Sequence, residues 1–507
     1  MMCYTVLNAQ KGALRRMDDK RTRKNLWMFP LGTVGRDMIY ALFNNFILTY
    51  VLFTRSLTAA QLSAITTIMV LARIFDAFND PIMGNIIERT RTRFGKYKPW
   101  LVIGILLTSV VIYAAFNSTL EGWSFVVFFG VIYFLYSITF TMHDISYWGM
   151  VAALGSYEDT RNRFTSRASL FAGIGNTAAS VLVPILTTGA YALGGNTQTA
   201  YGRVALVVCL IAPLMLCFTI FGVKENREDL AQKAPPISFK KIIHTVTRND
   251  QLLWIALIFL IQQIGNGLIA GGIGSTYIYL DFGYRGGLYS LFTMVGMAAT
   301  AFLMIFYPAI SRKVPRKKLM NAMMLIAGIG YGLILLCGLA LGQSTFKFWL
   351  VTLGYMLSNF GQYCFYLIMM ISIINTVEYN EYCHGERDEA IIASLRPFLT
   401  KMASAVIAAL TSISYLIFGV TSYTNQISSL EQQASQGLLE EAAKLDQIDQ
   451  VLSQVQSSQT RGLLVLMSVL PFVLMLLSHL LYRKHYKLDE TEYKRICDEL
   501  AQRKSAK

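Results

Sequence analysis

Charged residues are scarce in this chain of 507 residues. Only 15% are Asp, Glu, Lys or Arg, whereas soluble domains carry about 25%. Hydrophobic residues make up 54%, and the mean hydropathy is +0.45. Apolar runs of about 20 residues, the length of a helix that crosses a bilayer, recur along the chain. This composition excludes an ordinary soluble domain and predicts a protein that spans a membrane many times.

The sequence also lacks the patterns of several functional classes. The seven cysteines are scattered without a C-x-x-C pair, and the five histidines show no metal-ligand spacing. We therefore expect neither a disulfide framework nor a metal centre. No G-x-x-x-x-G-K-[ST] loop is present, so ATP hydrolysis is not expected as an energy source. Since no nucleophile–base pair stands out either, we expect a protein that is not an enzyme and has no cofactor.

The net charge of +15 would suit a nucleic-acid partner, but the placement of the charges argues against one. The basic clusters lie at residues 15–24, 89–98, 312–318 and 483–487, whereas the loops after odd-numbered apolar runs hold few basic residues. Cytoplasmic loops of membrane proteins carry such an excess. We therefore expect both termini in the cytoplasm, a multi-pass location in the inner or plasma membrane, the lipid bilayer as partner, and no nucleic acid.

The apolar pattern predicts an all-α membrane protein with 12 transmembrane helices in two six-helix halves. The expected helices cover about residues 26–53, 61–87, 99–117, 123–153, 168–193, 202–222, 252–281, 287–311, 319–342, 346–377, 395–423 and 461–483. The chain divides into an N-terminal tail (1–24), an N-terminal half (25–223), a central cytoplasmic loop (224–250), a C-terminal half (251–485) and a C-terminal tail (486–507). Such paired halves place a substrate site between them near the midplane of the membrane.

Two segments depart from regular spans. The glycine-rich run at 271–275 predicts an interruption of the seventh span, which either lines a cavity or allows close helix packing. The extracellular insertion at 424–460 has apolar residues every three to four positions from Ile427 to Val455, which predicts an amphipathic helix outside the membrane. This segment either caps the outer mouth, contacts a partner, or is a solvated hairpin that transport does not require.

The strongest functional signal lies in the second span. Asp76 and Asp80 are four residues apart and share one helix face, with Arg73 one turn earlier. A charge at the centre of a membrane helix costs about 2.5–3.5 kcal/mol, so intramembrane charges usually mark function. An internal ion pair between Arg73 and Asp76 is the alternative, but one arginine does not neutralise two carboxylates.

Six motifs resemble the glycoside–pentoside–hexuronide:cation symporters, a family of the major facilitator superfamily. They are the Asp76–Asn79–Asp80–Pro81 run, GKYKPW at 95–100, GRDMIYAL at 35–42, DISYWGMVAAL at 144–154, RNDQLLW at 248–254 and GERDEAIIASLRPFLTK at 385–401. The resemblance covers about residues 25–500, apart from the insertion, and is strongest to the melibiose carriers and the transporter segment of lactose–raffinose permeases. It implies the major facilitator superfamily fold.

The resemblance also implies three groups of functional residues. The cation-binding group is Asp76, Asn79, Asp80 and Thr141. The sugar-binding group is Arg36, Asp37, Asp144, Trp148, Arg167, Tyr366 and Lys401. The cytoplasmic gate is Arg161, Arg163, Glu378 and Glu381. Oxygen ligands suit sodium, whereas a proton needs a carboxyl group that takes it up near neutral pH. Lys401 lies in an apolar span and therefore needs an anionic partner such as Asp76 or Asp80.

Together these observations predict a secondary active transporter that takes up a sugar with Na⁺ and/or H⁺ by alternating access. The expected sugar is a glycoside, either a galactoside or a short oligosaccharide. Other glycosides, such as a pentoside or a glucuronide, remain open as substrates. An uncoupled facilitator and a membrane sugar sensor that does not transport remain open as functions.

Overall fold

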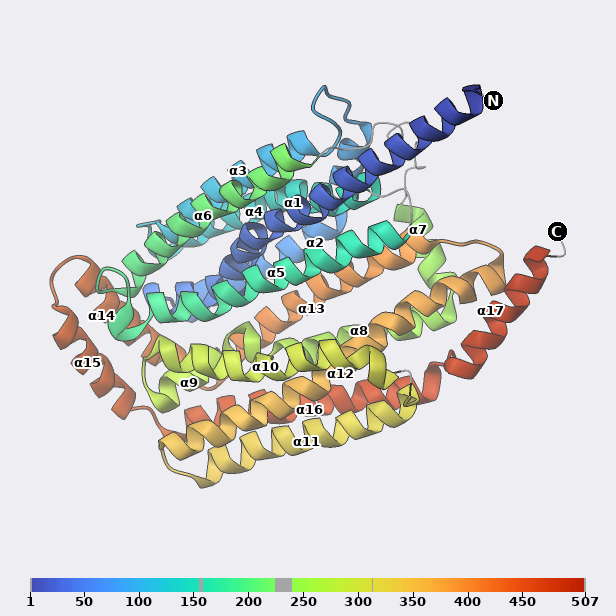
Figure 1. Cartoon of the computed structure of the whole chain (residues 1–507). Helices are drawn as coiled ribbons and strands as arrows, with labels where there is room; N and C mark the ends of the chain where they lie inside the picture. Colours follow the sequence, from blue (N-terminus) through green and yellow to red (C-terminus); the bar gives the residue numbers. More distant parts are fainter. Residues whose placement is uncertain (1, 155–157, 224–238, 312, 506–507) are drawn as a thin grey trace.

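The computed structural model describes residues 2–154, 158–223, 239–311 and 313–505, and these residues form helices joined by short loops (Figure 1). The N-terminal half contains α1 (Met2–Thr54), α2 (Ala59–Arg89), α3 (Lys98–Phe116), α4 (Gly122–Leu154), α5 (Glu158–Thr187), η1 (Gly189–Tyr191) and α6 (Thr197–Gly222). The C-terminal half contains α8 (Asp250–Gly267), η3 (Ile269–Ile273), α9 (Gly274–Phe282), α10 (Gly286–Ser311), α11 (Arg316–Ala340), α12 (Thr345–His384), α13 (Glu389–Ile417) and α16 (Ser457–His485). The remaining helices are α7 (Phe239–Arg248), α14 (Thr421–Ser435), α15 (Glu441–Ser453) and α17 (Glu490–Ser505).

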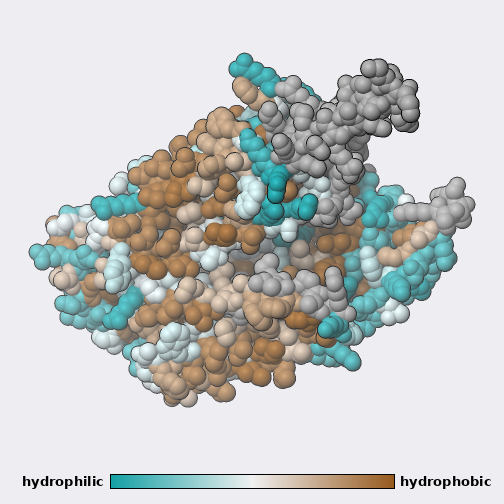
Figure 2. Space-filling model, in the orientation of Figure 1, coloured by the Kyte–Doolittle hydropathy of each residue, from teal (hydrophilic) through white to brown (hydrophobic). Residues whose placement is uncertain are grey.

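The number of predicted spans is confirmed, since 12 helices within the described ranges are long and apolar enough to cross a membrane. Figure 2 shows apolar residues across the middle of the face in view, with hydrophilic residues gathered at both ends. Apolar side chains such as Val127 of α4 and Leu210 of α6 are exposed. A face of this kind suits hydrocarbon rather than water, as expected for a protein embedded in a bilayer.

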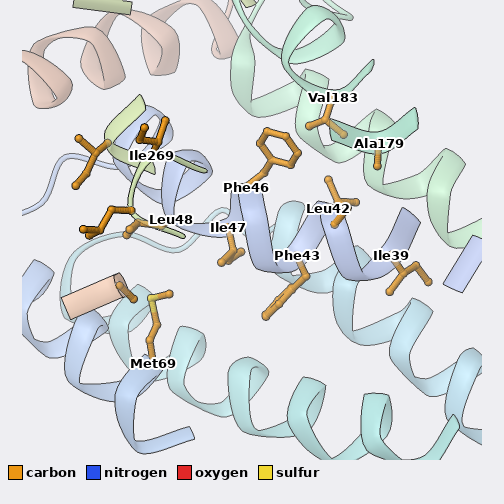
Figure 3. Close-up of a cluster of buried hydrophobic side chains, with 14 of the residues drawn as sticks. Ile39, Leu42, Phe43, Phe46, Ile47, Leu48, Met69, Ala179, Val183 and Ile269 are labelled. Carbon is orange, nitrogen blue, oxygen red and sulfur yellow. The ribbon is translucent and has the colours of Figure 1, made fainter. Parts of the chain in front are cut away.

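The first span lies inside the bundle. Its apolar window is 72% buried, against 33% for the fifth span. Leu42 and Phe46 point toward Val183 of α5, whereas Phe43 points to the other side of α1 (Figure 3). There, the ring of Phe43 stacks on Tyr136 of α4 at a centroid distance of 3.8 Å. Because α1 is packed on several sides, its polar residues are held in fixed positions.

Helices continue beyond several predicted boundaries. Residues 2–24, assigned above to the tail, continue α1, and α5 begins about ten residues earlier than expected. The central loop contains α7, and the C-terminal tail contains α17. Residues 224–238 of that loop lie outside the described part of the chain. The sequence prediction relied on long apolar runs, and it therefore missed helical segments whose composition is polar.

The predicted interruption of the seventh span is present. Gly272 has a φ of 122°, in a region that favours glycine, between α8 and α9. Its carbonyl accepts hydrogen bonds from the hydroxyls of Tyr415 at 2.7 Å and Ser275 at 2.8 Å. A side chain at Gly271 would lie only 2.4 Å from Ile407. The glycine run therefore bends the span and allows a close approach to α13, as the packing alternative predicted, whereas lining of a cavity stays a prediction.

The insertion at 424–460 forms two short helices, α14 and α15, instead of one. Gly437, with a φ of 73°, lies in the turn between them and lets the chain reverse. Figure 1 shows this pair at the end of the molecule opposite both termini. We call α14 and α15 the hairpin, and this end of the molecule the hairpin end.

The two halves approach closely at the hairpin end. Ser290 of α10 donates a hydrogen bond to the carbonyl of Val181 in α5 at 2.7 Å. The N–H of Gly286 donates to the carbonyl of Thr188 at 3.4 Å. Away from these contacts, the helices of the two halves diverge toward the termini (Figure 1). The arrangement is that of a molecule closed at the hairpin end.

Candidate functional site

One face of α4 carries most of the candidate site. Ser137, Thr141, Asp144 and Trp148 are spaced by four, three and four residues, which is the repeat of a single helix face. The first two contact carboxylates of α2, and the last two contact Arg36 of α1. One face of α4 therefore carries residues of both polar clusters.

The first cluster joins α2, α4 and α13. Ser137 donates a hydrogen bond to Asp76, and Thr141 donates one to Asp80 at 3.0 Å. The ammonium of Lys401 lies 2.5 Å from Asp80 Oδ2 and 3.9 Å from Asp76 Oδ2. Lys401 thus has the anionic partners that its position in an apolar span required. It also connects the two halves, because α13 belongs to the C-terminal half.

Charges in the first cluster balance. Arg73 lies 3.5 Å from Asp76 and donates a hydrogen bond to Asn44 of α1. Together Arg73 and Lys401 supply two positive charges against the two carboxylates of Asp76 and Asp80. The internal ion pair considered from the sequence is therefore present, but it accounts for only half of the negative charge.

Asn79 lies on α2 between Asp76 and Asp80, three residues after Asp76. Its side chain is buried, and Nδ2 has no hydrogen-bond partner among the described residues. The oxygen and nitrogen of an amide differ little in shape, so rotation of the group exchanges them. Two carboxylates, a hydroxyl and an amide oxygen form a donor set of hard oxygens, which fits an alkali cation.

The second cluster is centred on buried Arg36. Its guanidinium donates two hydrogen bonds to Asp37, at 2.8 and 3.0 Å, and one to Asp144 at 2.8 Å. It also lies over the rings of Tyr147 and Trp148, at 5.0 and 5.2 Å from their centroids. One arginine between two carboxylates leaves a net charge of −1. The side chain of Asp144 is 34% exposed, which leaves acceptor oxygens accessible to a ligand.

The two clusters are linked by one face of α1. Arg36, Tyr40 and Asn44 follow each other at intervals of four residues. Arg36 belongs to the second cluster, and Asn44 binds Arg73 of the first. At a rise of 1.5 Å per residue, these two positions are about 12 Å apart along the helix. A movement of α1 or α4 therefore shifts both clusters together.

The remaining predicted sugar residues contact other parts of the structure. Arg167 donates to the carbonyl of Leu26 at 3.3 Å and lies over the ring of Trp27. Tyr366 of α12 lies 5.9 Å from the guanidinium of Arg396. These contacts of Arg167 and Tyr366 stay within their own halves, and neither residue joins the cluster around Arg36.

Two of the predicted gate residues, Glu378 and Glu381, have a partner that was not predicted from the sequence. Arg387, in the turn between α12 and α13, binds Glu378 at 3.0 Å and Glu381 at 2.9 Å. Arg161 and Arg163 lie exposed in the first turns of α5. The ion pairs of Glu378 and Glu381 with Arg387 are contained in the C-terminal half.

Three residues that contact the predicted site and gate residues were not predicted from the sequence: Ser137, Asn44 and Arg387. Helix spacing was sufficient to find Ser137, because it lies one turn before Thr141 on the same face. Asn44 was recognisable as a polar residue two turns after Arg36. Arg387 carried a weaker signal, since it lies in a loop where its partners depend on the turn.

Comparison with known proteins agrees with this architecture. A family described as MFS/sugar transport protein matches residues 28–490. A lactose permease of Leuconostoc lactis is 29% identical over 413 residues, and a raffinose carrier protein of Pediococcus pentosaceus is 26% identical over 415 residues. Each alignment covers 78% of this chain, which spans only 62% of the length of either relative.

The fold is also found in solved structures. The crystal structure of a D-xylose–proton symporter superposes with a TM-score of 0.58 at 11% sequence identity. The match covers 87% of this chain and 99% of the symporter. At this identity the similarity concerns the fold alone, whereas the family match extends over most of the sequence. The chain belongs to the MFS/sugar transport protein family.

Proposed function

We propose that this protein is a secondary active transporter that takes up a glycoside together with a cation by alternating access. The observation that carries the proposal is the shared geometry of the two clusters on α1 and α4. A carrier that couples two solutes needs two sites whose occupancies affect each other. The two clusters share one face of α1 and one face of α4, and they lie about 12 Å apart along α1. This arrangement offers such a connection.

The first cluster is proposed to bind the coupling cation, Na⁺ or H⁺, through Asp76, Asn79, Asp80 and Thr141. The ammonium of Lys401 occupies the position beside Asp76 and Asp80 that a bound cation would take. A cation and the Lys401 ammonium would therefore compete for Asp80. Because Lys401 belongs to α13, displacement of its ammonium would loosen a contact between the halves, which links cation binding to a change in conformation.

The second cluster is proposed to bind the sugar. Carboxylates of Asp37 and Asp144 accept hydrogen bonds from sugar hydroxyls, and the guanidinium of Arg36 orients both. Trp148 offers a ring for the apolar face of a pyranose. Similarity to proteins named for lactose and raffinose favours a galactoside or a short oligosaccharide. Arg167, Tyr366 and Lys401 remain proposed sugar residues, which would have to approach the second cluster in another conformation.

Basic residues at 89–98 and 483–487 favour cytoplasmic termini, and the hairpin end would then be extracellular. The glutamates bound to Arg387, together with Arg161 and Arg163, would form the cytoplasmic gate. A molecule closed at the hairpin end would correspond to a carrier facing the cytoplasm.

The proposal is tested by uptake of radiolabelled sugars into membrane vesicles under an imposed Na⁺ or H⁺ gradient. We expect gradient-driven accumulation, which Asp80→Cys and Asp76→Cys abolish while some sugar binding survives. Asp446→Cys, on the exposed face of α15, serves as a control and should accumulate sugar normally. Normal accumulation by both span-two variants would refute the cation site. Sugar binding without any counterflow would identify a sensor instead.

A further inference from the structure

The hairpin belongs covalently to the C-terminal half, between α13 and α16, but its polar side chains bind the N-terminal half. Asn425 accepts a hydrogen bond from the N–H of Leu57 and donates one to its carbonyl, both at 2.9 Å. Gln432 donates to the carbonyl of Thr54 at 3.2 Å. α14 is therefore fastened to the connection between α1 and α2.

A buried ion pair forms the second attachment. Glu431 and Lys444 lie 3.2 Å apart, and both side chains are 0% exposed. Glu431 accepts a hydrogen bond from the N–H of Thr197 at 2.8 Å, and Lys444 donates one to the carbonyl of Gly195 at 2.6 Å. Since both charged residues belong to the hairpin, the pair can move with the C-terminal half as a unit.

The contact between Glu431 and Thr197 caps the N-terminus of α6. Thr197 is the first residue of α6, and the first N–H groups of a helix have no partner within the helix. Asn196 caps one of them by binding the N–H of Thr199 at 2.8 Å. The carboxylate of Glu431 caps another from the opposite half, where the positive end of the helix dipole favours an anion.

From these contacts we propose that the hairpin is a latch that holds the hairpin end closed. Alternating access requires the two halves to separate at each end in turn. Separation here must break the bonds to Thr54, Leu57, Gly195 and Thr197, whereas the Glu431–Lys444 pair stays intact within the hairpin. The latch thus favours the conformation that is open toward the termini. When the hairpin end closes again, the hairpin returns to the same four bonding positions. The inference rests on the proposed alternating access but not on the identity of the sugar.

The test measures opening of the hairpin end directly. Ser290→Cys places a thiol at a buried position between α5 and α10, and its reaction with a membrane-impermeant maleimide reports opening. Reaction of the native cysteines is measured in the parent that keeps Ser290 and is subtracted. Adding Asn425→Ala should accelerate labelling at least threefold. Gln450→Ala, on the exposed face of α15, is the matched control and should change nothing.

A cross-link tests the same contact in the opposite direction. The hydroxyls of Ser56 and Ser428 lie 3.0 Å apart across the halves. Oxidation of the Ser56→Cys/Ser428→Cys pair, introduced together with Ser290→Cys, should reduce labelling at position 290 to background, and a reductant should restore it. Variants that carry only one member of the cross-linking pair control for oxidation itself.

Labelling is measured in right-side-out and inside-out vesicles, so it does not depend on the proposed orientation or on sugar uptake. Unchanged labelling in Asn425→Ala on both sides, or continued labelling after complete cross-linking, would overturn the latch. A protein that showed the expected labelling but no sugar uptake would refute the proposed function and leave the latch standing.

Discussion

At the scale of single residues, the function proposed for the second cluster depends on charge as well as shape. Asp144→Asn and Asp37→Asn each keep one acceptor oxygen but remove a carboxylate from Arg36. A partner left without its bond in a desolvated site costs about 1–3 kcal/mol. Because 1.4 kcal/mol corresponds to a factor of ten, each variant should bind sugar about tenfold more weakly.

Equilibrium binding of a labelled sugar to the purified protein measures this loss, and cation binding without sugar should persist. Asp446→Asn is the control, since it removes a carboxylate from the exposed face of the hairpin. Normal sugar affinity in both Asp37→Asn and Asp144→Asn would place the sugar pocket elsewhere.

Residue spacing predicted some of the contacts in this site but not others. The four-residue interval between Asp76 and Asp80 placed both carboxylates near one ammonium, and the apolar surroundings of Lys401 called for an anionic partner. Both statements are local and follow from one helix at a time. The contacts of Arg387 and Glu431 depend instead on a turn and on how the two halves meet, which helix periodicity does not encode.

At the scale of helices, a single glycine controls how closely α5 and α10 approach. A Cβ atom on Gly286 would lie 1.7 Å from the carbonyl oxygen of Pro184, which belongs to the other half. Gly286→Ala should therefore force the helices apart, at the cost of about 1–3 kcal/mol that overpacking usually carries. The thermal unfolding midpoint should fall, and labelling of a cysteine at position 290 should become faster.

Its neighbour provides the matched control. A Cβ atom on Gly287 meets nothing within 4 Å, and both glycines lie in the first turn of α10. Gly287→Ala should therefore unfold and react like the parent. Equal effects of the two substitutions would show that local helix propensity matters here, and that the contact between the halves does not.

At the scale of the whole molecule, the contacts of the hairpin can either bias the proposed transport cycle or be required for it, and removal of the hairpin distinguishes the two. The 12 spans bury their own backbone hydrogen bonds, and a change in the length of a loop outside the bilayer costs little entropy. We therefore expect that replacing residues 426–458 with a short Gly/Ser linker leaves a folded carrier with at least half of its uptake rate.

This outcome would differ from that of the cross-link between positions 56 and 428, which should stop the cycle. Removing the hairpin destabilises the conformation that is closed at the hairpin end. Cross-linking the hairpin instead prevents the two halves from separating there, which every transport cycle would require. Initial uptake at matched membrane abundance compares the two proteins, and the linker variant should also expose a cysteine at position 290 more often. A normally inserted linker variant without uptake would show that the hairpin is required for transport itself, because the halves would then be unable to return to the closed position unaided.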